Sequence, residues 1–246
     1  MDYVILSLAA AATALATGLG AIPVFVFGTL SDMVRGALWG LTVGLMTVAS
    51  VVGLLAPALD EGAPITVSAG LVTGALFLLV TRMTLRRRDV HVGKLRGAGV
   101  RTSVLVFSVL FVHSLPEGLA IGTAYASDRA GLSLFVILAI ALQNVPEGTS
   151  VAIPMAAAGF SPRYQFWAAV GTSAPQPVGA IVAYVLVAHV EPLLPFSFAL
   201  AAGAMLTLVA VELAREAFAA RTWPAGVVGT LLGAAAMLGL AAMLGV

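Results

Sequence analysis

Long apolar runs recur along the whole chain, separated by short segments that carry charged residues, glycine or proline. A run of about 20 apolar residues is long enough to cross a lipid bilayer as a helix. The breaks between the runs define the spans to within a few residues at each end. The pattern predicts eight membrane-spanning helices, at about 3–27, 36–57, 65–84, 101–126, 131–158, 164–188, 196–217 and 224–246.

The composition supports this all-helical membrane fold. Of the 246 residues, 61% are hydrophobic and 9% are charged, whereas a soluble domain carries about 25% charged residues. The first span extends to Phe27 and has no basic segment before it, so we expect it to be retained rather than removed as a signal peptide. No segment has the composition of a soluble domain. Residues 1–246 are therefore expected to form a single transmembrane domain.

The basic residues predict how the chain is oriented in the membrane. Cytoplasmic loops are enriched in lysine and arginine, and the densest basic segment is the loop at about 85–100. With that loop in the cytoplasm, both termini are extracytoplasmic, and we expect a multi-pass protein of the cell (plasma or inner) membrane. Arg129 is the one exception, next to Asp128. The side predicted to be cytoplasmic carries Arg35, Arg82, Arg86, Arg87, Arg88, Lys94, Arg96, Arg101, Arg163, Arg215 and Arg221.

Net charge and cysteine content exclude two classes of interaction. The formal net charge of +1 and the absence of a basic face argue against nucleic acid as a partner. The chain has no cysteine, which excludes disulfides and thiolate metal ligands.

Two related motifs interrupt the apolar pattern near the middle of the fourth and fifth spans. The first reads HSLPEG (113–118) and the second reads QNVPEG (143–148). An ionisable side chain near the bilayer centre costs several kcal/mol and is by default a candidate for function. Because a carboxylate occurs in the same context twice, we interpret both motifs as parts of one site.

The spacing within each motif places its polar groups on one helix face, because residues three and four apart are neighbours. His113 lies one turn before Glu117, and Gln143 lies one turn before Glu147. Facing each other, the two helices offer one imidazole nitrogen and several oxygens. Such a set suits a divalent transition metal, with zinc first and Fe²⁺, Mn²⁺, Co²⁺ and Cd²⁺ as further candidates.

The proline in each motif removes a donor from the helical hydrogen-bond ladder. Pro116 leaves the carbonyl of Val112 without its helical partner, and Pro146 does the same to Leu142. We expect kinks here that open a polar path, with Gly118 and Gly148 allowing close helix approach. Since the two spans run in opposite directions, the motifs form an inverted repeat. Transporters bind their substrates at such repeats, near the membrane midplane.

At these residues the chain resembles the ZIP (Zrt-, Irt-like) family of divalent metal-ion transporters, whose signature is HNxPEG. The first helix (ATGLGAIPVF), the second (GLMTVASVVGLLAPAL) and the seventh (AAGAMLTLVAVELARE) are also similar to that family. The resemblance implies eight helices arranged as three, two and three, with zinc or a related ion moved toward the cytoplasm by alternating access. It also implies that the metal ligands are His113, Glu117, Gln143 and Glu147.

The chain departs from the family pattern at positions around this site. Ser114 stands where asparagine is common, Asn144 where some members have aspartate, and Gln176 where some have glutamate. These neutral residues cannot balance a second dication, so we expect one metal ion where some relatives hold two. Ser114, Asn144 and Gln176 are candidates for a hydrogen-bonded surround of the metal or for its release path. Glu212 is a candidate for the release path or for an interfacial ion pair.

Two alternatives remain open from the sequence. A metal in a membrane cavity could activate water, which would make the protein a metal-dependent intramembrane hydrolase, although the HExxH motif is absent. The protein could instead be a metal sensor, or a transporter of another solute that uses the same site structurally. The transporter interpretation predicts no enzymatic activity and no resident cofactor, with the metal as transported substrate. The expected partners are the metal ion and the lipid bilayer, and a second copy of the chain is a candidate partner.

Overall fold

The computed structural model describes residues 3–28, 30–87, 98–190 and 192–246. Within these ranges every regular element is helical, and eight helical segments are long and apolar enough to cross a membrane. This confirms the predicted number of spans and the all-helical fold. The largest difference is in the second span, which is longer at both ends than predicted. The eight segments are Tyr3–Phe27, Asp32–Glu61, Pro64–Leu85, Thr102–Ala126, Ala130–Ala157, Pro162–His189, Leu193–Ala217 and Trp223–Leu244.

Four of the spans are single helices, and four are divided. The undivided spans are α5 (Pro64–Arg87), α6 (Ala98–Ala126), α7 (Ala130–Ala157) and α12 (Trp223–Leu244). The first span comprises α1 (Tyr3–Leu19) and α2 (Ile22–Phe27), and the sixth comprises α8 (Pro162–Thr172) and α9 (Pro175–His189). The second and seventh spans each contain a π-helical turn: α3 (Asp32–Ser50), η1 (Val51–Leu55) and α4 (Ala56–Glu61), then α10 (Leu193–Leu208), η2 (Val209–Leu213) and α11 (Ala214–Ala217).

The interruptions do not fall at the two motif prolines. Helices α6 and α7 continue through Pro116 and Pro146, because neighbouring helices in a membrane bundle can support a turn that lacks one hydrogen bond. The breaks lie instead in the first and sixth spans. These two breaks are adjacent, since the hydroxyls of Thr17 and Ser173 are 2.6 Å apart.

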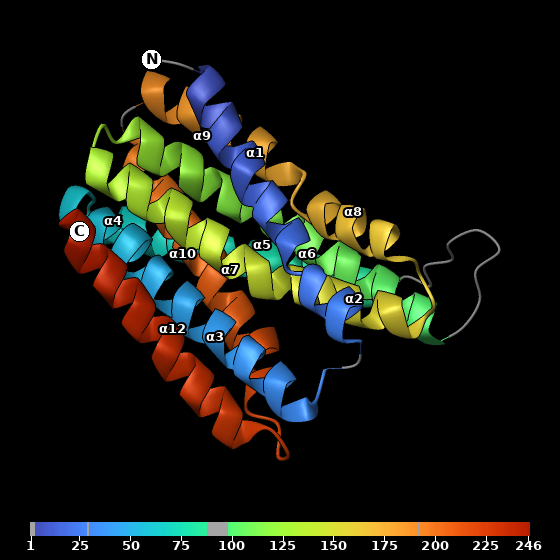
Figure 1. Ribbon diagram of the computed structural model, residues 1–246. Helices are drawn as coiled ribbons and strands as arrows, with labels where there is room; N and C mark the ends of the chain where they lie inside the picture. The colour runs from blue at the N-terminus through green and yellow to red at the C-terminus, as the bar shows by residue number, and fades with distance from the viewer. Residues whose placement is uncertain (1–2, 29, 88–97, 191) are drawn as a thin grey trace.

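The spans pack in four extensive pairs that form two groups. In the first group α6 packs on α9 and α1 packs on α7. In the second group α12 packs on α3 and α10 packs on α5. Figure 1 shows α12 in red beside the blue α3, with α1 and α9 at the other edge of the bundle. We call α1, α2 and α6–α9 the motif group, because it contains both motifs, and the remaining helices the flanking group.

Glycines allow the helices of each pair to approach closely. A Cβ atom on Gly148 of α7 would lie 1.7 Å from the Thr17 carbonyl oxygen, and one on Gly118 of α6 would lie 2.3 Å from that of Gln176. The α3–α12 pair has the same feature at Gly40, where a Cβ would lie 2.0 Å from the Gly226 carbonyl oxygen. Small residues that let backbones touch are the usual basis of helix association in lipid. The expectation of close approach at Gly118 and Gly148 is confirmed.

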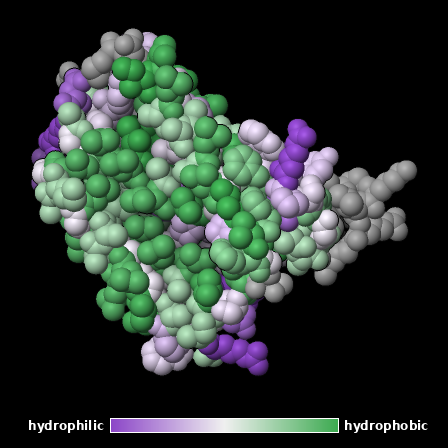
Figure 2. Space-filling model, viewed as in Figure 1, coloured by the Kyte–Doolittle hydropathy of each residue, from purple (hydrophilic) through white to green (hydrophobic). Residues whose placement is uncertain are grey.

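The outer surface of the bundle is suited to lipid. Figure 2 shows apolar residues over the middle of the visible face and hydrophilic residues gathered toward the ends of the helices. Helices α5 and α12 are the least covered spans, with 22% of their most apolar windows buried inside the protein. Their exposed side chains include Val72, Leu76, Leu231 and Leu232. These faces can remain exposed only where the solvent is hydrocarbon.

An ion pair joins the two groups at one end of the bundle. Arg129, which precedes α7 in the motif group, places its Nη2 2.6 Å from Oε1 of Glu61, the last residue of α4 in the flanking group. The start of α7 also meets the end of α12, since a Cβ on Gly131 would lie 2.6 Å from the Leu244 carbonyl oxygen. The groups are therefore in contact at the end of the molecule where α7 begins.

The close approach at Gly148 yields a stability prediction. Gly148→Ala should destabilise the protein by about 1–3 kcal/mol, because the added methyl group overlaps the backbone of α1 and forces the helices apart. Thermal unfolding of the purified, metal-free protein in detergent measures this. Gly239→Ala is the matched control, because a Cβ there meets nothing within 4 Å, and its stability should be unchanged or higher. Equal melting temperatures for wild type and Gly148→Ala would contradict the packing argument.

Candidate metal site

The two motifs face each other inside the protein. Helices α6 and α7 run side by side, and their motif residues point into the interior of the motif group. The four predicted ligands, His113, Glu117, Gln143 and Glu147, are all buried, none with more than 2% of its surface exposed. The structure thus places an imidazole, an amide and two carboxylates together in the apolar interior.

Three of these side chains are close enough to share an ion. One ligand atom from each of His113, Glu117 and Glu147 can be chosen so that all lie within 4.8 Å of one another. His113 Nε2 lies 3.6 Å from Glu117 Oε1, which is longer than a hydrogen bond. A cation between the three groups could contact each of them without a large rearrangement of the helices.

Gln143 contributes to the same cluster through its amide. Its Nε2 donates to Glu117 Oε1 at 2.6 Å. The other amide atom, Oε1, is buried and has no hydrogen-bond partner among the described residues. The nitrogen is therefore held by Glu117 while the oxygen remains free to bind a cation, as expected for an amide ligand.

Four buried polar atoms without partners lie together at this site. Both ring nitrogens of His113 and the Oε1 atoms of Gln143 and Glu147 lack a hydrogen-bond partner within the described part of the chain. Buried polar groups are normally paired, and each exception requires an explanation such as an ion or water. Since three predicted ligand residues supply these atoms, a bound cation is the simplest explanation.

The neutral residues near the site form a hydrogen-bonded layer behind Glu117. Gln176 Nε2 donates to Glu117 Oε2 at 2.6 Å, and Asn144 Nδ2 donates to the carbonyl of Thr13 at 2.7 Å. Ser114 is buried in the same turn of α6. Thr13 was not predicted from the sequence, although Thr13 and Thr17 are spaced four apart in an apolar span, a pattern that could have indicated a buried polar face.

Glu212 lies away from this cluster, in a second polar region. Its Oε2 is 2.6 Å from Nη2 of Arg82, and the same Arg82 group donates to the Val211 carbonyl at 3.3 Å. Of the two alternatives given for Glu212, the ion pair is present, and its partner is Arg82 of α5. Glu212 also lies in the π-helical turn η2, an irregularity often found at functional sites.

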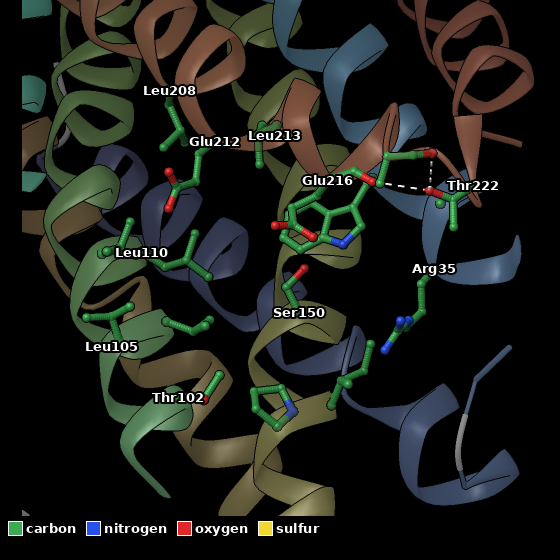
Figure 3. Close-up of a pocket in the computed structure, with 17 residues that line it drawn as sticks. Arg35, Thr102, Leu105, Leu110, Ser150, Leu208, Glu212, Leu213, Glu216 and Thr222 are labelled. Carbon is green, nitrogen blue, oxygen red and sulfur yellow. Dashed lines mark hydrogen bonds between the residues drawn. The ribbon is translucent and has the colours of Figure 1, made fainter. Parts of the chain in front are cut away.

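A cavity of about 370 Å³ lies between the two groups, next to Glu212. Figure 3 shows Glu212 and Glu216 on one side of it, Ser150 of α7 and Leu110 of α6 on others, and Arg35 of α3 at its edge. Leu110 is one turn before His113, and Ser150 is one turn after Glu147. The cavity therefore reaches to within about one helical turn of the candidate ligands.

Most of the loop predicted at about 85–100 lies outside the described residues. The structure does not describe residues 88–97, so the expected cytoplasmic, arginine-rich loop stays a prediction.

The fold and the site together define an integral, multi-pass membrane protein that buries a set of metal-ligand side chains. The family model described as "ZIP Zinc transporter" matches residues 86–241. The chain belongs to this family. The resemblance inferred from the two PEG motifs is thus confirmed.

Relatives from bacteria and plants support the assignment. The zinc transporter GufA of Myxococcus xanthus is 32% identical over 212 residues, covering 82% of this chain and 84% of the relative. The zinc transporter ZIPB of Bordetella bronchiseptica is 31% identical over 249 residues, covering 94% and 78%. A protein of Arabidopsis thaliana, provisionally named a zinc transporter, is 34% identical over 209 residues that cover 84% of this chain and 33% of the plant protein. The chain thus spans about a third of that relative's length.

The charge of the cluster predicts how many ions it holds. We expect one zinc ion per chain, because two carboxylates balance one dication and the other nearby groups, Ser114, Asn144 and Gln176, are neutral. Elemental analysis of purified protein, loaded with zinc and then freed of excess, measures the ratio. Glu147→Gln is the control, which should bind far less metal. Two tightly held ions per wild-type chain would contradict this prediction.

Proposed function

We propose that this protein transports zinc, or a related divalent ion such as Fe²⁺, Mn²⁺, Co²⁺ or Cd²⁺, across the cell membrane toward the cytoplasm. The ion binds near the membrane midplane to His113, Glu117, Gln143 and Glu147. The chain acts as a single transmembrane domain whose eight helices are arranged as three, two and three with inverted-repeat symmetry. Both termini are extracytoplasmic.

The observation that carries the proposal is the set of buried, unpartnered ligand atoms on α6 and α7. An isolated carboxylate in a medium of low dielectric constant is strongly disfavoured unless it is paired or neutralised. Glu117 and Glu147 lie together in such a medium, without a buried lysine or arginine among their contacts in the described residues. A dication supplies the missing charge, and His113 supplies the nitrogen ligand that favours zinc over Ca²⁺ or Mg²⁺.

The cavity supports a direction for the ion's path. It extends from about one helical turn away from the ligands to Arg35 and Glu216. Arg35 belongs to the side of the protein that the positive-inside rule assigns to the cytoplasm. Glu212 and Glu216 face this space (Figure 3). They provide carboxylates to which an ion leaving the site could bind weakly before release.

The two helix groups support alternating access. All four ligands lie in the motif group, whereas Glu212 and Glu216 lie in the flanking group. The groups enclose a cavity at one end and are joined by the Arg129–Glu61 pair at the other. A movement of one group relative to the other would close the first end and open the second. The ligands would then face opposite sides of the membrane in turn.

The hydrolase and sensor alternatives are disfavoured. The relatives GufA and ZIPB are named zinc transporters. A transporter requires both a midplane binding site and a path for the ion. The structure supplies candidates for both. A hydrolase would in addition need a metal-bound water with room for a peptide or lipid beside it.

Metal uptake into liposomes tests the proposal directly. Purified protein should mediate zinc entry, whereas Glu117→Gln and Glu147→Gln should each reduce uptake to background. Each amide removes a charge that the buried dication requires, a loss of about 3–5 kcal/mol or more than about 100-fold in binding. Asp60→Asn is the control for loss of an exposed carboxylate outside the site and should leave uptake unchanged. Normal uptake by both site variants would refute the assigned ligands.

The chemistry of the ligands also predicts how binding depends on pH. A bound metal requires neutral imidazole and ionised carboxylates, so protons compete with zinc for the same atoms. Zinc affinity should therefore decrease continuously as the pH is lowered from about 8 to about 5. Isothermal titration calorimetry on the folded protein measures this, with circular dichroism to confirm that the helices persist. A constant affinity across this range would exclude proton competition at the site.

The Arg129–Glu61 pair provides a test of alternating access. The chain has no cysteine, so Glu61→Cys with Arg129→Cys creates the only pair of thiols. Joining them with a short, cleavable bifunctional thiol reagent should stop uptake, because the two groups can no longer separate at that end. Cleavage of the linker should restore uptake.

A second cross-linked pair controls for the chemistry. Arg163 and Trp167 are both exposed and lie one turn apart within the single helix α8. Linking Arg163→Cys to Trp167→Cys should leave uptake unchanged. Full uptake with Glu61→Cys and Arg129→Cys quantitatively joined would show that the groups do not separate there during transport.

A further inference from the structure

Both carboxylate oxygens of Glu117 accept a hydrogen bond from a side-chain amide. Gln143 Nε2 donates to Oε1 from α7, and Gln176 Nε2 donates to Oε2 from α9, each at 2.6 Å. Within the described ranges, the Oε1 atom of Gln143 has no hydrogen-bond partner and can bind a cation. Gln176 presents its nitrogen to Glu117 and turns its oxygen away, so the two amides have different tasks.

The orientation of Gln176 is set by neighbours on α1 and α7. The backbone carbonyl of Thr13 can only accept a hydrogen bond, so Asn144 must turn its Nδ2 toward it, at 2.7 Å. With Asn144 turned this way, its Nδ2 is 3.3 Å from Gln176 Oε1 and its Oδ1 is 3.4 Å from Gln176 Nε2. If the Gln176 amide were reversed, its nitrogen would face the Asn144 nitrogen and its oxygen would face the Asn144 oxygen, so neither hydrogen bond could form.

The hydroxyl of Thr13 reinforces this orientation. Its single proton faces two acceptors, Gln176 Oε1 at 2.9 Å and the Ala10 carbonyl oxygen at 2.8 Å, and is shared between them. Thr13, Asn144 and Gln176 are fully buried, each with 0% of its surface exposed. No water is needed to complete the chain of bonds from α1 through α7 and α9 to α6.

We propose that Thr13, Asn144 and Gln176 form an amide lock that positions Glu117 for metal binding. The lock holds one oxygen of Glu117 with a fixed N–H group, which keeps the carboxylate in a single orientation beside His113 and Glu147. Gln176 is a positioning residue that acts through Glu117 and does not itself contact the ion. The break in the sixth span, just before Pro175, places Gln176 in the first turn of α9, where its side chain can reach α6.

This inference rests on the proposed function, because it assumes that Glu117 binds the metal. It adds a role for α1, which carries no predicted ligand. The contact between Gly118 and the Gln176 backbone, where a Cβ would lie 2.3 Å from the carbonyl oxygen, keeps α9 close enough for the lock to form.

Zinc affinity of the purified protein, measured by calorimetry, tests the lock. Gln176→Leu keeps a side chain of similar size but removes the donor, and should weaken zinc binding about 10- to 100-fold, as the loss of groups that orient metal ligands usually does. Wild type that binds no zinc would refute the proposed function itself. Wild type that binds zinc, with Gln176→Leu binding equally well, would refute only the lock.

Two threonines on α1 separate positioning from general stability. Thr13→Val and Thr17→Val each remove one buried hydroxyl from the same helix, but Thr17 contacts Ser173 and not the lock. Thr13→Val should weaken zinc binding roughly 2- to 10-fold, the usual effect of one hydrogen bond, and Thr13→Ser should restore it. Thr17→Val should change thermal stability only. Equal zinc affinities for Thr13→Val and Thr17→Val would overturn the role of Thr13.

Discussion

The central constraint on this protein is the burial of two carboxylates, Glu117 and Glu147, in an apolar bundle. Charges in such a medium must be paired or neutralised, and most features of the motif group answer this requirement. Amide N–H groups from Gln143 and Gln176 bond to Glu117. Beside them, Glu147 has an oxygen without a hydrogen-bond partner among the residues that the structure describes. The protein thus supplies hydrogen bonds to one carboxylate and leaves the other with an oxygen that the proposed cation would bind.

Close helix packing makes this arrangement attainable. Without a hydrophobic force between helices in lipid, association depends on van der Waals contact and interhelical hydrogen bonds. Glycines at 118 and 148, each directly after a motif glutamate, bring α9 and α1 against the backbones of α6 and α7. The same contacts carry Gln176 and Thr13 to the site. Packing and ligand geometry are therefore produced by the same few residues.

Three of the four irregular turns in the described residues lie next to the site or the cavity. The breaks in the first and sixth spans adjoin each other beside the lock, and the π-helical turn η2 carries Glu212 at the cavity. The first three spans and the last three thus each include one broken span and one span with a π-helical turn. This correspondence agrees with an internal repeat in which the first three spans match the last three.

The sequence by itself determined the eight spans, the buried motifs and their four candidate ligands. Hydrophobic length and the spacing of three and four residues are local properties, which can be read along one chain segment. It could not determine the partners of Gln176, the Arg82–Glu212 pair or the position of the helix breaks. Thr13 and Gln176 are separated by 163 residues, so only the packing of α1 against α7 and α9 brings them together. The motif prolines indicated a local break, but neighbouring helices supported α6 and α7 through them. Which amide atom of Gln176 faces Glu117 was decided by contacts from α1 and α7, and that choice depends on tertiary structure alone.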